Sequence, residues 1–108
     1  MHEDIDARSL ALHQLIADKI RRDPSLFLVS SAVIQRWRAL VCPATHPYLD
    51  QWQQLIDSGM EACLDFATQN SEHARAMRQS SPFVGILSNK ERFEFLKNWS
   101  QRRATAAT

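Results

Sequence analysis

The sequence DARSLALHQLIADKIRRDP (residues 6–24) predicts a long first helix and the place where it ends. Its apolar residues recur at three- and four-residue spacing, which gathers them on one face of a helix. They are Leu12, Leu15, Ile16 and Ile20. Basic residues fill the last turn, where positive charge suits the negative end of the helix dipole. We expect this helix to begin at about Asp4 or Asp6 and to end at Arg22.

Asp23-Pro24 separates the first helix from a second one. Proline cannot continue a helix, but it suits the first position of a new one, with Asp23 as the N-cap. The second helix is expected to run to Val41. Its β-branched residues would also suit a strand, but the spacing of its apolar residues and the capping signals favour a helix. Its predicted buried stripe is Leu26, Val29, Val33, Trp37, Leu40 and Val41.

Turn and capping signals divide the rest of the chain. Two S-x-x-E capping boxes, Ser58 with Glu61 and Ser88 with Glu91, mark helix starts. Gly59 suits the left-handed end of the helix before it. Further helices are expected over residues 47–57, 58–69, 71–79 and 89–102, with a buried tryptophan, Trp52, in the first of these. The predicted fold is therefore all-α: a compact bundle of five to six short helices forming one domain, residues 1–108, with a frayed tail from about residue 103.

Composition excludes several classes of protein. The 108 residues carry 13 Lys and Arg against 12 Asp and Glu, a net charge of +1, which is too balanced for a chain whose main task is to coat nucleic acid. Two glycines are too few for the turns of a β-sandwich or barrel. No apolar run approaches the roughly 18 residues of a membrane span, and the polar N-terminus lacks a secretion signal. We expect a cytoplasmic protein with no membrane partner.

The residues that usually carry chemistry do not form a pattern. The four histidines are scattered at positions 2, 13, 46 and 73, without the spacing of a metal site, and there is no C-x-x-C pair. Cys63 has helical spacing to apolar neighbours, which is typical of a core thiol, and nothing near Cys42 indicates an activated nucleophile. We therefore predict no metal, no cofactor and no enzymatic activity.

Charge is segregated along the chain. Residues 55–72 hold four acids and no Lys or Arg, whereas residues 73–108 hold seven basic residues against two acids. Asp57, Glu61 and Asp65 recur every four residues and form either a solvated helix face or a docking stripe for a basic partner. DNA binding is the alternative for the basic C-terminal third of the chain (residues 73–108), but the helix after Gly59 is acidic and would repel phosphate.

The segment RQSSPFVGIL (residues 78–87) is the least helical and most unusual part of the chain. Its polar residues could bind a partner with Phe83 as an apolar anchor; alternatively, Phe83, Ile86 and Leu87 lock the segment onto the helical body. A guanidinium can grip a carboxylate with two hydrogen bonds, and Trp and Arg are favoured interface anchors. The candidate partner-binding residues are Arg75, Arg78, Gln79, Ser80, Ser81, Phe83, Arg92 and Trp99.

The motif ARAMRQSSPFVGILS (residues 74–88), followed by Glu91-Arg92, resembles the LRQSSPFAGVLSxxER stretch of a family of small, all-helical bacterial proteins. The N-terminal SLALHQLIADKIRRDP (residues 9–24) resembles that family's SLxLHxxIAxKLxxDP helix, and Trp37 and WQQLI (residues 52–56) match its central elements. The resemblance covers about residues 9–99. Met77 stands where the family usually has Leu, and Val84 where it has Ala.

The resemblance implies an antitoxin-type role, because many genes of this family lie beside genes for nucleotidyltransferase-like toxins. It implies no catalytic residues. The basic C-terminal third would then contact an acidic surface, such as the metal-binding carboxylates of that toxin, with Arg78 and Arg92 as anchors. On this hypothesis Arg78→Ala and Arg92→Ala each weaken the complex and leave the melting temperature nearly unchanged. A DNA-binding transcriptional regulator and a structural interaction protein are the alternatives.

Overall fold

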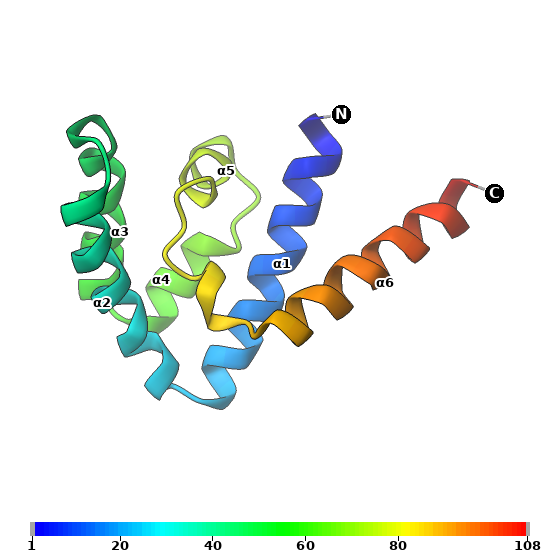
Figure 1. Ribbon diagram of the computed structural model, residues 1–108, viewed down its shortest axis with the longest axis horizontal. Helices are drawn as coiled ribbons and strands as arrows, with labels where there is room; N and C mark the ends of the chain where they lie inside the picture. Colours follow the sequence, from blue (N-terminus) through cyan, green and yellow to red (C-terminus); the bar gives the residue numbers. More distant parts are fainter. Residues whose placement is uncertain (1, 108) are drawn as a thin grey trace.

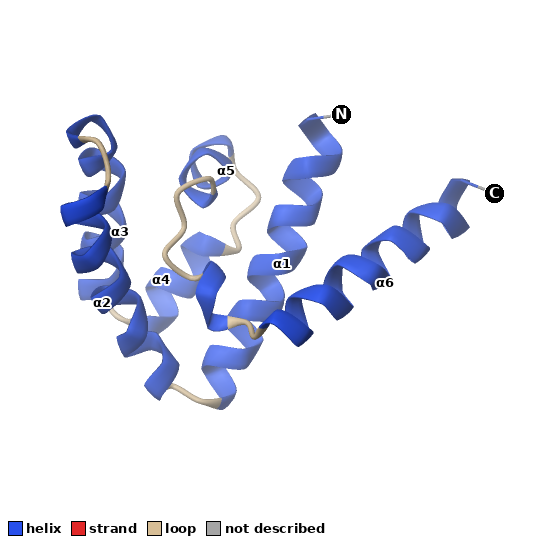
Figure 2. Ribbon diagram, viewed as in Figure 1, coloured by secondary structure: helices blue, strands red, loops and turns tan. Residues whose placement is uncertain are grey.

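Helices make up nearly all of the computed structural model, which describes the backbone of residues 2–107 and the side chains of residues 5–44 and 46–101. The elements, in order, are α1 (His2–Arg22), α2 (Ser25–Leu40), the 3-10 helix η1 (Pro43–Thr45), α3 (His46–Asp57), α4 (Met60–Ala67), α5 (Glu72–Arg78), the 3-10 helix η2 (Val84–Ile86) and α6 (Asn89–Ala107). No strand occurs among residues 2–107 (Figure 2). The prediction of an all-α fold, a compact bundle of five to six helices, is confirmed, since the described residues form six α-helices.

The first helix packs against α2, α4 and α5, the third packs against α2 and α4, and α6 leads away from the rest of the chain (Figure 1). The radius of gyration is 14.4 Å, against about 13 Å for a compact chain of this length. The last helix extends outward from the body, and one side of α1 faces it (Figure 1).

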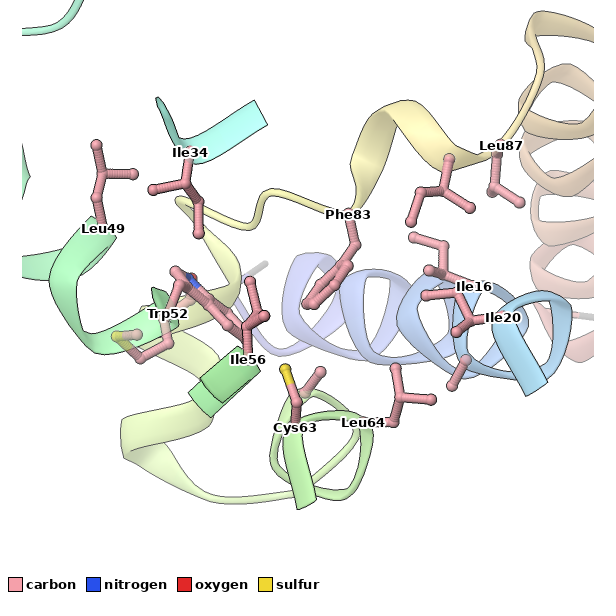
Figure 3. Packing of buried hydrophobic residues seen from close by; sticks show 14 residues of the cluster. Ile16, Ile20, Ile34, Leu49, Trp52, Ile56, Cys63, Leu64, Phe83 and Leu87 are labelled. Carbon is pink, nitrogen blue, oxygen red and sulfur yellow. The ribbon is translucent and has the colours of Figure 1, made fainter. Parts of the chain in front are cut away.

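The core is centred on Trp52, whose side chain is 0% exposed. The indole Nε1 donates a hydrogen bond to the Met77 carbonyl (3.0 Å), and its ring meets Phe83 edge to face with centroids 5.5 Å apart. Phe83 extends from the chain before η2 toward α1, so it joins the two halves of the core (Figure 3). The other large buried apolar residues are Ile16, Ile20, Ile34, Leu49, Leu64 and Met77.

Two of the predicted helix starts form as the capping rules require. Ser71 accepts a hydrogen bond from the Ala74 amide (3.2 Å) at the start of α5. In the second capping box, the Ser88 amide donates to Glu91 Oε1 (2.9 Å) and the Glu91 amide donates to Ser88 Oγ (3.1 Å). This exchange begins α6 at Asn89, as predicted.

The first capping box does not form. Ser58 Oγ donates to the Leu55 carbonyl (2.6 Å), so this hydroxyl closes α3 instead of opening α4. Gly59 occupies the N-cap of α4 with φ of 117°, a conformation that favours glycine, although its ψ of 156° lies outside the left-handed helical region. The Glu61 carboxylate is drawn to Arg21 on α1, because that ion pair offers it a charged partner.

The second helix also differs from its prediction. It starts at Ser25, and the Asp23 carboxylate accepts a hydrogen bond from the Ser25 hydroxyl (2.6 Å) instead of capping the helix. Only Ser30 and Ile34 are fully buried on α2, while Trp37 is half-buried and Leu40 is exposed. The expectation of a buried Trp37 is therefore corrected: α3 and α1 cover a narrower face of α2 than its apolar pattern offers.

The last helix continues beyond its predicted end at Arg102 and reaches Ala107. The expected frayed tail from about residue 103 falls on side chains outside the described residues. The backbone of α6 is helical through this stretch as far as Ala107.

Candidate functional site

A cleft of about 500 Å³ lies between the N-terminal half of α1, α5 and the first half of α6. We call it the α1–α6 cleft. Its apolar lining is Ile5, Leu12, Val84, Phe95 and Leu96. Its polar lining is Asp6, Arg8, Ser9, His13, Arg75, Arg78, Gln79 and Arg92. The volume lies in the range of binding pockets, and the lining combines apolar walls with a larger number of polar residues.

The first turn of α6 is fixed to the body and sets the mouth of the cleft. Lys19 on α1 donates to the Ile86 carbonyl (2.9 Å) and pairs with the Glu91 carboxylate (2.5 Å). Arg92 Nη2 donates to the Val84 carbonyl (2.8 Å) in η2. These bonds hold the start of α6 against α1 and η2, from which α6 diverges (Figure 1).

The ion pair with Lys19, together with the Ser88 cap, lowers the pKa of Glu91 from 4.5 to about 2. A lowered folded-state pKa stabilises the fold above the unfolded value, and this stabilisation is lost as the pH falls toward 2. We expect Glu91→Gln, which keeps a capping side chain, to unfold at lower denaturant than the wild type at pH 7. The difference should shrink between about pH 5 and pH 2 when unfolding is followed by circular dichroism. A pH-independent difference would contradict the role of the Lys19 charge.

Arg78 crosses the floor of the cleft and is only 4% exposed. Its Nη1 donates to the carbonyls of Ala67 (3.1 Å) and Gln69 (2.8 Å), which ties α5 to the end of α4. Burial lowers the pKa of its guanidinium from the usual value. The structure corrects the assumption that Arg78 is a free surface anchor, because the side chain is buried and bonded to two backbone carbonyls, and we now expect its removal to lower the melting temperature.

His13 lies beside Arg78 in the cleft lining and is 2% exposed. Its Nδ1 donates to the Ser9 carbonyl (2.8 Å) one turn earlier in α1. Burial lowers the pKa of His13, which keeps the ring neutral at pH 7 with a lone pair on Nε2. Sequence spacing does not single out this histidine, because the residues that line the cleft beside it come in part from α5, η2 and α6.

Three buried nitrogens that lack a hydrogen-bond partner belong to residues of this one cleft. They are His13 Nε2, Arg78 Nε and Arg92 Nε. Buried polar groups without partners are uncommon in folded proteins, because each costs free energy. Two further atoms of this kind among the described residues, Gln53 Oε1 and Trp99 Nε1, belong to residues outside the cleft lining.

The charge of the cleft is positive. Among the residues whose side chains the structure describes, four arginines, Arg8, Arg75, Arg78 and Arg92, share the lining with one acid, Asp6. Arg8 and Arg75 are exposed, whereas the other two are held against backbone carbonyls. The arrangement is suited to attract carboxylate or phosphate groups.

The predicted partner-binding residues divide into two groups. Arg75, Arg78, Gln79 and Arg92 are brought together in the lining of the cleft. Trp99 lies one turn further along α6, half-buried and stacked on Phe95 with ring centroids 6.2 Å apart. The lining residues that the prediction missed include Ile5, Arg8, Leu12, Phe95 and Leu96. The helical spacing of Ile5 and Leu12, which continues the apolar pattern toward the N-terminus, was the only signal for that wall.

The second group belongs to the core. Phe83 is 0% exposed and Ser81 is buried, with its Oγ accepting a hydrogen bond from the Phe83 amide (3.2 Å). Ser80 is half-buried and donates to the Met77 carbonyl (3.3 Å). The expected partner contacts at Ser81 and Phe83 are therefore corrected. Of the two alternatives for the segment 78–87, the structure supports the one in which its apolar residues lock it onto the body.

The acidic residues Asp57, Glu61 and Asp65, which lie on α3 and α4, are partly paired within the chain. Arg21 pairs with Glu61 (3.1 Å) and Asp65 (3.4 Å), and hydrogen bonding to Glu61 raises the pKa of the arginine. Asp57 accepts a hydrogen bond from Gln53 (2.9 Å). Exposed pairs of this kind contribute little to stability, but they reduce the charge that a basic partner would meet.

The two cysteines differ sharply in accessibility, and burial raises the pKa of Cys63 to about 12. We expect the exposed Cys42 to react with a thiol reagent in the native protein, and Cys63 to react only after unfolding. A colorimetric thiol titration with and without denaturant measures both. Two fast-reacting thiols in the native protein would contradict the buried position of Cys63.

Within the described residues, no group of three His, Cys, Asp or Glu could hold a metal ion.

No protein-family model, no curated protein and no solved structure matches this chain. In the part of the chain that the structure describes, none of the helices combines the length and the apolar character needed to cross a bilayer. Function is therefore inferred from the geometry and charge of the α1–α6 cleft.

Proposed function

We propose that the protein is a protein-binding module of the antitoxin or regulatory type, which acts on its partner by direct contact. The observation that carries this proposal is the uncovered apolar side of α6 beside a basic cleft. Phe93 is 67% exposed and Leu96 is 41% exposed, and Leu96 also lines the cleft. Exposed large apolar side chains next to arginines are typical of protein interfaces.

An antitoxin neutralises its partner by covering or distorting a site, which requires surface and charge complementarity. The arginines of the α1–α6 cleft are complementary to a carboxylate-rich surface. A nucleotidyltransferase-like toxin, the partner that the resemblance of residues 74–92 implies, holds catalytic metal ions with carboxylates. The geometry and the resemblance thus support the same type of partner.

The proposal is tested by purifying the tagged protein from its native host and identifying what remains bound in a complex of fixed stoichiometry. We expect one protein partner, whose activity falls when the purified chain is added at equal concentration. We expect Leu96→Glu to abolish the complex, because a charge replaces an apolar contact at the interface.

Leu40→Glu provides the matched control, since Leu40 is 74% exposed on α2 at a distance from the cleft. It should leave the complex intact. Equal loss in both variants, or recovery of DNA in place of a protein, would contradict the proposed function.

A further inference from the structure

We infer that the α1–α6 cleft receives an acidic amphipathic helix of the partner protein, whose apolar side chains enter the cleft and whose carboxylates meet its arginines. This inference rests on the proposed function, because it names the part of the partner that the surface recognises. Its basis is the combination of two diverging apolar walls with a positive floor.

The walls of the cleft come from two helices. Ile5 and Leu12 lie on α1, and Phe95 and Leu96 lie on α6. The two helices meet near the Lys19–Glu91 pair and diverge from there toward their free ends (Figure 1). Amphipathic helices bind in grooves of this kind through apolar residues spaced along one face.

The floor and rim of the cleft favour carboxylates. Arg78 and Arg92 use Nη atoms to bind carbonyls of the chain itself, and the buried Nε–H of each has no partner. Arg8 and Arg75 are exposed at the rim. A partner's carboxylates can reach the exposed guanidinium groups of Arg8 and Arg75, while the charges of Arg78 and Arg92 beneath them add to the positive potential of the cleft.

A second copy of this chain fits the cleft poorly. Residues 89–101 of α6 carry three basic side chains against two acids, so they would bring like charge to the arginines. The acidic helix of the chain, α4, has its apolar residues Cys63 and Leu64 in the core and its carboxylates paired with Arg21. Charge complementarity therefore favours a different protein.

The inference is tested with three probes: a synthetic helical peptide with Leu and Glu on opposite faces, the same peptide with Gln for Glu, and a single-stranded oligonucleotide. Fluorescence anisotropy measures affinity, and nuclear magnetic resonance locates the perturbed amides. We expect the acidic peptide to bind at least about tenfold more tightly than the Gln peptide and to weaken with salt. The shifted amides should lie in residues 5–13 and 92–99.

Two surface variants test whether the peptide binds in the cleft itself or binds any charged or apolar part of the surface. Arg8→Glu and Leu96→Ala should each weaken binding of the acidic peptide about tenfold, since each removes one of the two kinds of contact. The matched controls are Arg36→Glu and Leu40→Ala on the exposed side of α2, which should bind like the wild type. Circular dichroism of all four variants establishes that each is folded.

Three outcomes would overturn the inference: no binding of the acidic peptide, equal binding of the Gln peptide, or tighter binding of the oligonucleotide. Its failure is distinguishable from that of the proposed function. Suppose that the native complex forms, that Arg8→Glu does not weaken it, and that the acidic peptide does not bind. The assignment of an acidic helix to the cleft is then wrong, and the protein-binding role stands. If the peptide binds but the native host yields no protein partner, the proposed function fails.

Discussion

Trp52→Ala is expected to lower the free energy of unfolding by about 3–5 kcal/mol, the usual cost of emptying a core aromatic site. The indole is fully buried, packs edge to face against Phe66 and Phe83, and donates a hydrogen bond to the Met77 carbonyl. It joins α3 to the segment that follows α5. The loss is a large fraction of the roughly 5–15 kcal/mol that stabilises a domain of this size.

Denaturant unfolding followed by circular dichroism measures this change. Trp52→Phe, which keeps most of the ring, gives a milder variant that remains folded for measurement. Trp37→Ala is the control, and its cost should be clearly smaller because Trp37 is half-buried at the edge of the core. A larger loss from Trp37→Ala than from Trp52→Ala would show that the core is centred elsewhere.

Arg78→Ala is expected to destabilise the fold, even though the residue lines the proposed binding surface. Its guanidinium satisfies the carbonyls of Ala67 and Gln69 where α4 ends. Leaving a buried carbonyl without a donor costs about 1–3 kcal/mol, so the loss of this side chain should be evident in the melting temperature.

Two matched variants locate the origin of this loss. Arg78→Lys keeps the charge but lacks the planar guanidinium that spans both carbonyls, so it should recover only part of the stability. Arg75→Ala removes an exposed arginine from the same helix and should melt close to the wild type. A wild-type melting temperature for Arg78→Ala, combined with loss of the partner, would restore Arg78 as a pure interface anchor.

The helices and several of their ends could be predicted because their signals are local. Capping by Ser71, and by Ser88 with Glu91, depends on residues within one turn, and proline stops a helix wherever it occurs. The prediction that Trp37 is buried was wrong for a physical reason. Periodicity identifies which side of a helix is apolar, but the neighbouring helices decide how much of that side is covered.

The candidate site was harder to predict because it joins distant parts of the chain. Lys19 and Glu91, which lie 72 residues apart, set the position of α6 against α1. Charge segregation was enough to select Arg75 and Arg92, but no local pattern could place Ile5 opposite Leu96. Phe83 was misassigned as a candidate anchor, because an apolar residue in a loop has the same sequence pattern whether it packs inward or waits for a partner.

Hydrogen–deuterium exchange of the chain, free and in the complex purified from its native host, tests most directly whether the α1–α6 cleft is the partner-binding surface. Our account predicts slower exchange on complex formation in residues 5–13 of α1 and 92–99 of α6, with no change over the outer side of α2. Protection confined to α2 and α3, around the exposed Leu28, Leu40 and Tyr48, would contradict it and place the interface on the opposite side of the molecule.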